Sequence, residues 1–107
     1  MTPMRARLFA VLAGAALLAA CATLAPHPTV EDVARAPTRS PAVTLADLER
    51  GRSLYLGRCS SCHHTFEPKS KSAESWPGYI DKMKQRAKLS DGDAALVLDY
   101  LVTMAQM

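Results

Sequence analysis

The most constraining feature of this chain is the pentapeptide Cys59-Ser60-Ser61-Cys62-His63, in which two cysteines flank two serines and a histidine follows directly. C-x-x-C-H is the pattern of c-type haem attachment. In that arrangement each thiol can add to one vinyl group of a haem, and the adjacent imidazole lies under the iron as its proximal ligand. The motif therefore predicts one covalently bound haem c, held by Cys59 and Cys62 with His63 on the iron.

Three other uses of the cysteine pair fit the sequence less well. A thioredoxin-like redox pair needs a βαβ setting, and no segment has the pattern of parallel strands. A zinc site needs four ligands, and the only other histidines are His64, next to His63, and the distant His27. A structural disulfide between Cys59 and Cys62 is geometrically possible but leaves His63 unexplained.

The N-terminus carries an export signal, which is expected if the haem is attached outside the cytoplasm. Arg5 and Arg7 form a short positive region. They precede an uncharged apolar run from Leu8 to Ala20, which is too short to span a bilayer comfortably as a permanent helix. Residues 1–20 are therefore predicted to be a signal peptide.

The apolar run ends in Leu18-Ala19-Ala20-Cys21, which resembles the lipobox of bacterial lipoproteins. The resemblance implies lipidation of Cys21 as the first residue after cleavage; an ordinary cleavage site beside a coincidental cysteine is the alternative. The haem uses two of the three cysteines and leaves Cys21, which favours the lipobox. Acyl chains contribute about 0.8 kcal/mol per buried methylene to membrane attachment. In the Gram-negative lipoproteins that this motif resembles, a residue other than aspartate after the cysteine, here Ala22, implies sorting to the outer membrane, so the resemblance implies a periplasmic protein anchored there by its lipid.

The charge balance argues against nucleic acid as a partner. The full chain has 13 Lys and Arg against 10 Asp and Glu, but Arg5 and Arg7 leave with the signal peptide, so the mature chain has 11 against 10. Two haem propionates would make the domain neutral or slightly acidic. A basic cluster is either a solvated face or a docking rim for an acidic redox partner protein. It consists of Lys69, Lys71, Lys82, Lys84, Arg86 and Lys88.

Residues 21–43 are predicted to be a flexible, proline-rich tether that begins at the lipidated Cys21. Four of the seven prolines lie here, without apolar periodicity: Pro26, Pro28, Pro37 and Pro41. The 22 residues after Cys21 would reach on the order of 70 Å if they stay extended at about 3.1 Å per residue. The remaining domain, residues 44–107, is small for a self-sufficient apolar core, and a covalent haem would supply the missing hydrophobic mass.

The periodicity of this domain predicts an all-α fold of about three helices. Thr44 can cap the first helix, with Asp47 at the capping-box position. Ser90 can cap the last helix, with Asp93 three residues on. Gly51 inside the first helix costs about 1 kcal/mol relative to alanine, which suggests the close approach of another backbone. The first and last helices should therefore cross at Gly51.

This helix pair resembles the class I cytochrome c fold, in which an N-terminal helix with a glycine and an aromatic residue crosses a C-terminal helix ending in Tyr-Leu. The matching residues are Gly51, Tyr55, Tyr100 and Leu101, and the haem motif follows the first helix directly. The resemblance covers residues 44–105 and implies a small cytochrome c domain wrapped around its haem. A cytochrome c′ bundle does not fit, because its haem motif lies near the end of the chain.

A middle helix over residues 75–88 carries the candidate sixth ligand of the iron. Pro77 is tolerated only in the first turn, which places the helix start near Ser75. Met83 lies on the apolar face, and short bacterial cytochromes c have a distal methionine between the haem motif and the final helix, so the resemblance implies Met83 as iron ligand. A plain core methionine is the alternative. Met104 and Met107 are weaker candidates, as core and frayed terminus respectively.

Two further residues have open roles beside the haem. Trp76 is either a core aromatic or a cofactor-binding residue that donates its indole N–H to a haem propionate. The carbonyl of Pro68 is a candidate acceptor for the free N–H of His63, a bond that would orient the imidazole ring.

These features together predict a monohaem electron-transfer protein, in which His63 and Met83 close the coordination sphere of the iron and leave no site for substrate. The chain is therefore not expected to be an enzyme. The alternatives are a haem protein that binds or senses a gas or small ligand at an open sixth position, and an electron-relay subunit of a larger oxidoreductase.

Overall fold

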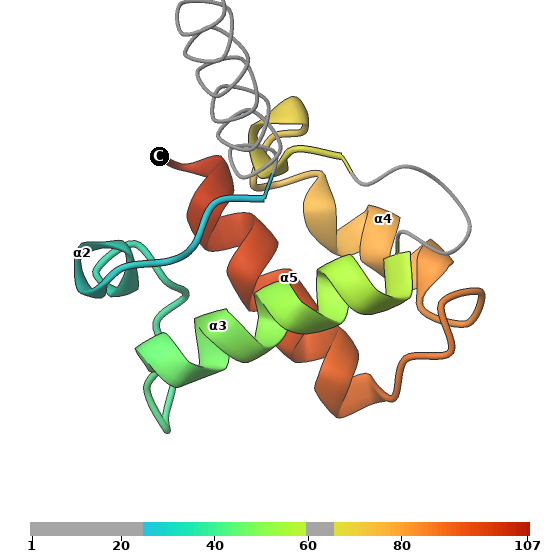
Figure 1. The fold of residues 1–107 in the computed structure, drawn as a ribbon, viewed down its shortest axis with the longest axis horizontal. Coiled ribbons are helices and arrows are strands. Elements are labelled where there is room, and N and C mark those ends of the chain that lie inside the picture. The colour runs from blue at the N-terminus through green and yellow to red at the C-terminus, as the bar shows by residue number, and fades with distance from the viewer. Residues whose placement is uncertain (1–24, 60–65) are drawn as a thin grey trace, which may run out of the picture.

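The computed structural model describes residues 25–59 and 66–107, and every regular element in these two ranges is helical (Figure 1). The all-α prediction is confirmed for these ranges. No helix within them is long and apolar enough to cross a bilayer. The predicted signal peptide and Cys21 lie outside the described residues. In chain order the elements are α2 (Val30–Val33), α3 (Leu45–Leu54), the π-helical turn η1 (Tyr55–Cys59), the 3-10 turn η2 (Pro68–Ser70), α4 (Trp76–Met83) and α5 (Asp91–Ala105).

Side-chain caps set where the two long helices begin. The Thr44 hydroxyl accepts a hydrogen bond from the backbone N–H of Asp47 at 3.1 Å, and the Asp47 carboxylate accepts one from the N–H of Thr44 at 3.0 Å. The Ser90 hydroxyl accepts a bond from the N–H of Asp93 at 3.1 Å. These bonds satisfy N–H groups that a helix start otherwise leaves unpaired. The caps predicted for α3 and α5 are confirmed.

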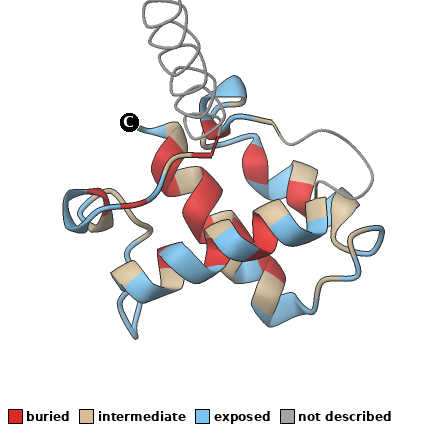
Figure 2. Ribbon diagram, in the orientation of Figure 1, coloured by how far each residue is buried: buried red, intermediate tan, exposed pale blue. Residues whose placement is uncertain are grey.

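α3 and α5 cross at Gly51, as the sequence predicts. A methyl group at this position would lie 2.1 Å from the carbonyl oxygen of Leu96 and 3.0 Å from Cβ of Tyr100. Only a residue without a side chain allows the two backbones to come so close. Figure 2 shows the buried residues gathered where α3, α4 and α5 meet. The core there contains Leu54, Tyr55, Trp76, Ile80, Ala94, Val97, Tyr100, Leu101 and Met104.

The middle helix keeps regular α-helical form over a shorter range than the predicted residues 75–88. α4 covers Trp76–Met83, with Pro77 in its first turn as expected. The chain then makes a further helical turn that stops at Lys88, whose φ of 54° is left-handed. The N–H of Leu89 donates back to the carbonyl oxygen of Lys84 at 2.9 Å, a bond typical of a Schellman stop. The segment therefore ends where the sequence predicts.

Residues 25–43, here called the N-terminal arm, pack on the helices, whereas the prolines predict an extended tether. Ala25 is buried, and the short helix α2 contacts both α3 and α5. The Tyr100 hydroxyl donates to the carbonyl oxygen of Pro26 at 2.7 Å. Nε of Arg52 donates to the carbonyl oxygen of Ala25, also at 2.7 Å. From residue 25 onward, the expected tether is therefore part of the folded body.

Candidate haem site

Cys59 is the only residue of the attachment motif among the described residues; Cys62 and His63 lie outside them. Cys59 ends η1, where α3 changes from α-helical to π-helical hydrogen bonding. Such π turns are frequent at functional sites. The Cys59 side chain is half-buried and packs against the apolar core. α3 and η1 thus deliver the first thiol of the motif to the edge of the core.

A hydrogen bond joins the two ends of the segment that carries the motif. Tyr55 is buried one turn before Cys59, and its hydroxyl donates to the carbonyl oxygen of Phe66 at 2.5 Å. The bond fixes the distance between Tyr55 and Phe66, which lie on either side of the motif in the sequence. The sequence assigns Tyr55 to the helix crossing only. Nothing in its spacing indicates the bond to Phe66.

Four aromatic rings form a continuous series at this edge of the core. The ring centroids of Tyr55 and Trp76 lie 6.3 Å apart, those of Trp76 and Tyr79 lie 5.6 Å apart, and those of Tyr79 and Phe66 lie 6.2 Å apart. All three pairs are edge-to-face, the geometry that adds about 0.5–1.5 kcal/mol per pair beyond the burial of area. The three contacts tie Phe66 and Tyr79 to the same core cluster against which Cys59 packs.

Two members of the basic cluster have partners within the domain. Nζ of Lys71 lies 4.6 Å from the ring centroid of Tyr79, a cation–π contact. Nζ of Lys84 lies 3.2 Å from a carboxylate oxygen of Asp81 and 3.5 Å from one of Asp91. The other four basic side chains are exposed and so accessible to a partner: Lys69, Lys82, Arg86 and Lys88.

The structure gives Trp76 the features of a core aromatic residue. Its side chain is fully buried, and the indole Nε1–H donates to the carbonyl oxygen of Pro68 at 2.8 Å. The indole proton that a haem propionate would need is therefore already used. The Pro68 carbonyl oxygen, which the sequence proposes as an acceptor for His63, accepts this bond and keeps a second lone pair; His63 itself lies outside the described residues.

The three C-terminal methionines differ in burial. Met83 is the last residue of α4 and is half-buried. Met104 belongs to the core, and Met107 is 51% exposed, which agrees with the core and terminus roles expected of them. Met83 is thus neither fully buried nor at the chain end, and its role as the sixth ligand of the iron stays a prediction.

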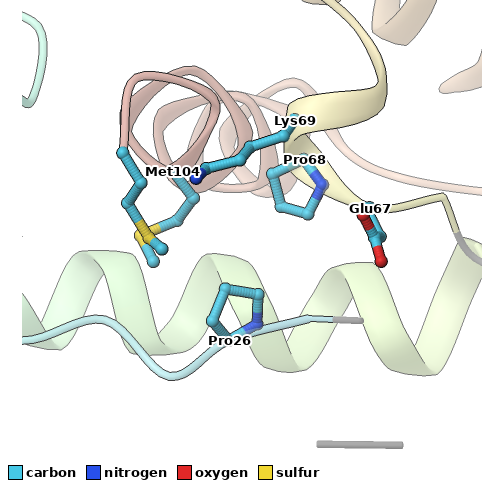
Figure 3. A pocket seen from close by; sticks show the side chains of 6 residues that line it. Pro26, Glu67, Pro68, Lys69 and Met104 are labelled. Atoms are coloured by element: carbon cyan, nitrogen blue, oxygen red, sulfur yellow. The ribbon is translucent and has the colours of Figure 1, made fainter. Parts of the chain in front are cut away.

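A cavity of about 330 Å³ lies at the C-terminal end of α5, where α5, η2 and the start of the N-terminal arm meet (Figure 3). Its position follows from the burial of Ala25, which brings the arm against the end of α5. The lining is mainly apolar, and among the described residues it includes neither Cys59 nor Met83 but does include Met104 and Met107, the weaker ligand candidates. The cavity is lined by Pro26, Glu67, Pro68, Lys69, Met104 and Met107.

The described part of the candidate site fits a covalently bound haem. Covalent attachment of haem needs a thiol at the edge of an apolar core, and the Cys59 side chain lies in such a position. The polar atoms of the buried neighbouring rings are paired within the chain, Tyr55 with Phe66 and Trp76 with Pro68. Within the described ranges, no three His, Cys, Asp or Glu side chains form a group that could hold a metal ion.

Two buried tyrosines predict a loss of stability in alkaline solution. Burial raises the pKa of Tyr100 to about 12, and it also raises the pKa of Tyr55. Since the unfolded value is about 10, this contribution to stability is complete below that pH and is lost as the pH rises toward the folded-state pKa. Urea unfolding between about pH 8 and 11 should show a falling free energy of unfolding, with a shallower fall in Tyr100→Phe. Identical pH dependence in the two proteins would contradict this.

A scan against protein-family models, a search of curated proteins and a search of solved structures found no match to this chain. The functional assignment therefore depends on the attachment motif and on the contacts around Cys59.

Proposed function

We propose that this chain is an extracytoplasmic electron-transfer protein of the class I cytochrome c type, attached to a membrane by a lipid at Cys21. It carries one haem c, bound to Cys59 and Cys62, with His63 as the proximal ligand. The observation that carries the proposal is the C-x-x-C-H motif, whose first thiol stands at the end of η1 against the apolar core. When bound, the haem supplies reversible one-electron exchange at its iron.

The protein's part in this function is to hold the haem, keep water from it and complete the coordination of the iron. The buried rings of Tyr55 and Trp76 would belong to the apolar core against which the first thioether packs. Met83 would be the sixth ligand, which raises the reduction potential and leaves no position for a substrate. We therefore expect the chain to exchange electrons with other redox proteins and to catalyse no reaction by itself.

Met83→Ala is expected to abolish the weak methionine–iron charge-transfer band of the ferric protein, because alanine has no sulfur to bind the iron. Met107→Ala is the matched control, since Met107 is exposed at the terminus and should leave the band unchanged. Absorption spectra of the ferric protein measure both variants. A band of normal intensity in Met83→Ala would show that the sixth ligand is another residue.

A haem protein that binds a gas or small ligand is the second candidate function. The observation that favours it is the partial exposure of Met83, which ends α4 at the margin of the core. Carbon monoxide separates the two functions, because a ferrous iron closed by methionine binds it poorly at neutral pH. The electron-transfer proposal expects weak binding by the native protein and ready binding by Met83→Ala. Ready binding by both would favour the second candidate.

A further inference from the structure

The N-terminal arm is fixed to the domain at both of its ends. Ala25, at its start, is 3% exposed, and Val43, directly before the cap of α3, is 5% exposed. Between them, the arm contains α2, whose buried Asp32 accepts hydrogen bonds from the backbone N–H and hydroxyl of Thr29 and pairs with Arg35. The arm thus has its own local structure as well as buried ends.

The strongest attachment of the arm is a bidentate ion pair with α5. Nη1 and Nη2 of Arg39 donate to the two carboxylate oxygens of Asp99 at 2.7 and 2.6 Å. The Asp99 side chain is 6% exposed, so its charge is removed from water and needs this partner. Paired N–H donors on a carboxylate are among the stronger hydrogen bonds in proteins. The next residue of α5, Tyr100, makes the bond to Pro26 described above.

We propose that the docked N-terminal arm holds the domain against the membrane surface in one orientation, and that its release would let the domain reach far from that surface. The proposal rests on the lipidation of Cys21 proposed above. Only residues 22–24 separate Cys21 from the buried Ala25, so the lipid-bearing residue stands at most about 14 Å from the folded body. An undocked arm would extend this reach to roughly 70 Å.

The docked arm also determines which face of the domain lies toward the lipid. Pro26 shares its cavity with η2 and Met104, so the described part of the N-terminal arm begins beside the C-terminal end of α5 (Figures 1 and 3). Exposed Lys69 and the half-exposed Met107 lie at this end, a cation and an apolar side chain that suit the headgroup region. The start of α5 is the end of this helix that lies farther from the cavity and from the C-terminus (Figure 1).

The junction of α4 and α5 is therefore the part turned toward soluble partners. A second hollow at this junction is lined in part by Ile80, Lys84 and Asp91. The exposed Arg86 and Lys88 follow α4 close to it in the chain. A domain held this way presents Arg86 and Lys88 away from the lipid, whereas Lys69 lies at the lipid side.

Limited trypsin digestion of the full chain tests the docking. The arm contains two cleavage sites, Arg35 and Arg39, whereas Arg50 and Arg52 lie in α3 and report unfolding of the domain. Asp99→Asn keeps the shape of the side chain and removes the charge that Arg39 binds. We expect cleavage in the arm to become at least about tenfold faster in this variant, with the α3 sites still protected.

The control is Asp91→Asn, the same change at an exposed position of α5, which should leave cleavage in the arm at the native rate. Tyr100→Phe removes only the hydroxyl that donates to the Pro26 carbonyl. It is a second way to release the arm if Asp99→Asn does not fold. Equal cleavage in the native chain, Asp99→Asn and Tyr100→Phe would overturn the proposal. The digestion uses the full chain as it is produced and measures only the docking of the arm, so it can fail independently of the proposed function.

The distance to the membrane is tested with the lipidated full chain in phosphatidylcholine vesicles that contain a fluorescent lipid. The haem quenches the dye by energy transfer, which falls steeply with distance, and the haem content is measured on the same sample. We expect strong quenching by the native chain and at least about twofold weaker quenching by Asp99→Asn. Equal quenching by the two haem-loaded proteins would overturn the proposed role in holding the domain at the membrane.

Discussion

Gly51→Ala is expected to destabilise the folded chain by about 3 kcal/mol, although alanine is the better helix former. The added methyl group would lie 2.1 Å from the carbonyl oxygen of Leu96, which is backbone and cannot rotate away as a side chain could. α3 and α5 would have to separate, and every core contact between them would weaken. Urea unfolding followed by circular dichroism measures the change.

Gly92→Ala is the matched control for the helix crossing. Gly92 lies in the first turn of α5, and a methyl group there would meet no atom within 4 Å. This variant should be as stable as the native chain or more stable by up to about 1 kcal/mol. If Gly51→Ala were no less stable than Gly92→Ala, the helices could not cross as closely as the structure has them.

Cys59→Ser is expected to reduce the covalently attached haem by at least about tenfold, because a serine hydroxyl lacks the nucleophilic thiolate that bonds to a vinyl group. The change falls at the margin of the core, so the helices themselves should persist. Haem staining after denaturing electrophoresis measures attachment, and circular dichroism measures the helices.

Cys21→Ser is the matched control for haem attachment, since it alters the third cysteine of the chain. It should keep its haem and lose its lipid, so the protein would leave the membrane fraction. Equal haem staining in Cys59→Ser and the native chain would remove Cys59 from the site. Membrane retention of Cys21→Ser would instead argue against the lipid anchor.

The helical part of the fold could be predicted because its signals are local. The hydroxyls of Thr44 and Ser90 each accept a hydrogen bond from the backbone N–H three residues later. Both partners of each bond are therefore neighbours in the sequence. Gly51 is informative because a glycine in a helix interior is costly and indicates a neighbouring backbone. The α-helix α4 ends at Met83, earlier than the predicted residue 88, and the left-handed turn at Lys88 was not predictable either, because lysine has no preference for it.

The docked arm could not be predicted, because its attachments join residues far apart in the chain. Arg39 and Asp99 are 60 positions apart, and Pro26 and Tyr100 are 74 apart. Prolines indicate that a segment lacks regular backbone hydrogen bonds. This holds for a free tether, and it holds equally for a docked segment whose carbonyl oxygens accept hydrogen bonds from side chains. The composition of the segment does not distinguish the two.

The chemistry proposed for the candidate site comes from the motif alone, and its surroundings could be predicted only in part. The motif specifies the thiols and the imidazole through their spacing alone. The bond from Trp76 to Pro68, and the bond from Tyr55 to Phe66, depend on how the chain turns after the motif. Side-chain packing of this kind follows from the assembled core, so it is known only when the helices are in place.

The covalent haem is the central claim, and the pyridine haemochrome spectrum of the full chain tests it most directly. The protein would be produced with export to the periplasm and washed with acidified acetone, which extracts any haem that is not covalently bound. We predict that one haem per chain remains in the protein and gives the spectrum of a haem whose vinyl groups have become thioethers. A colourless protein after extraction would contradict the account.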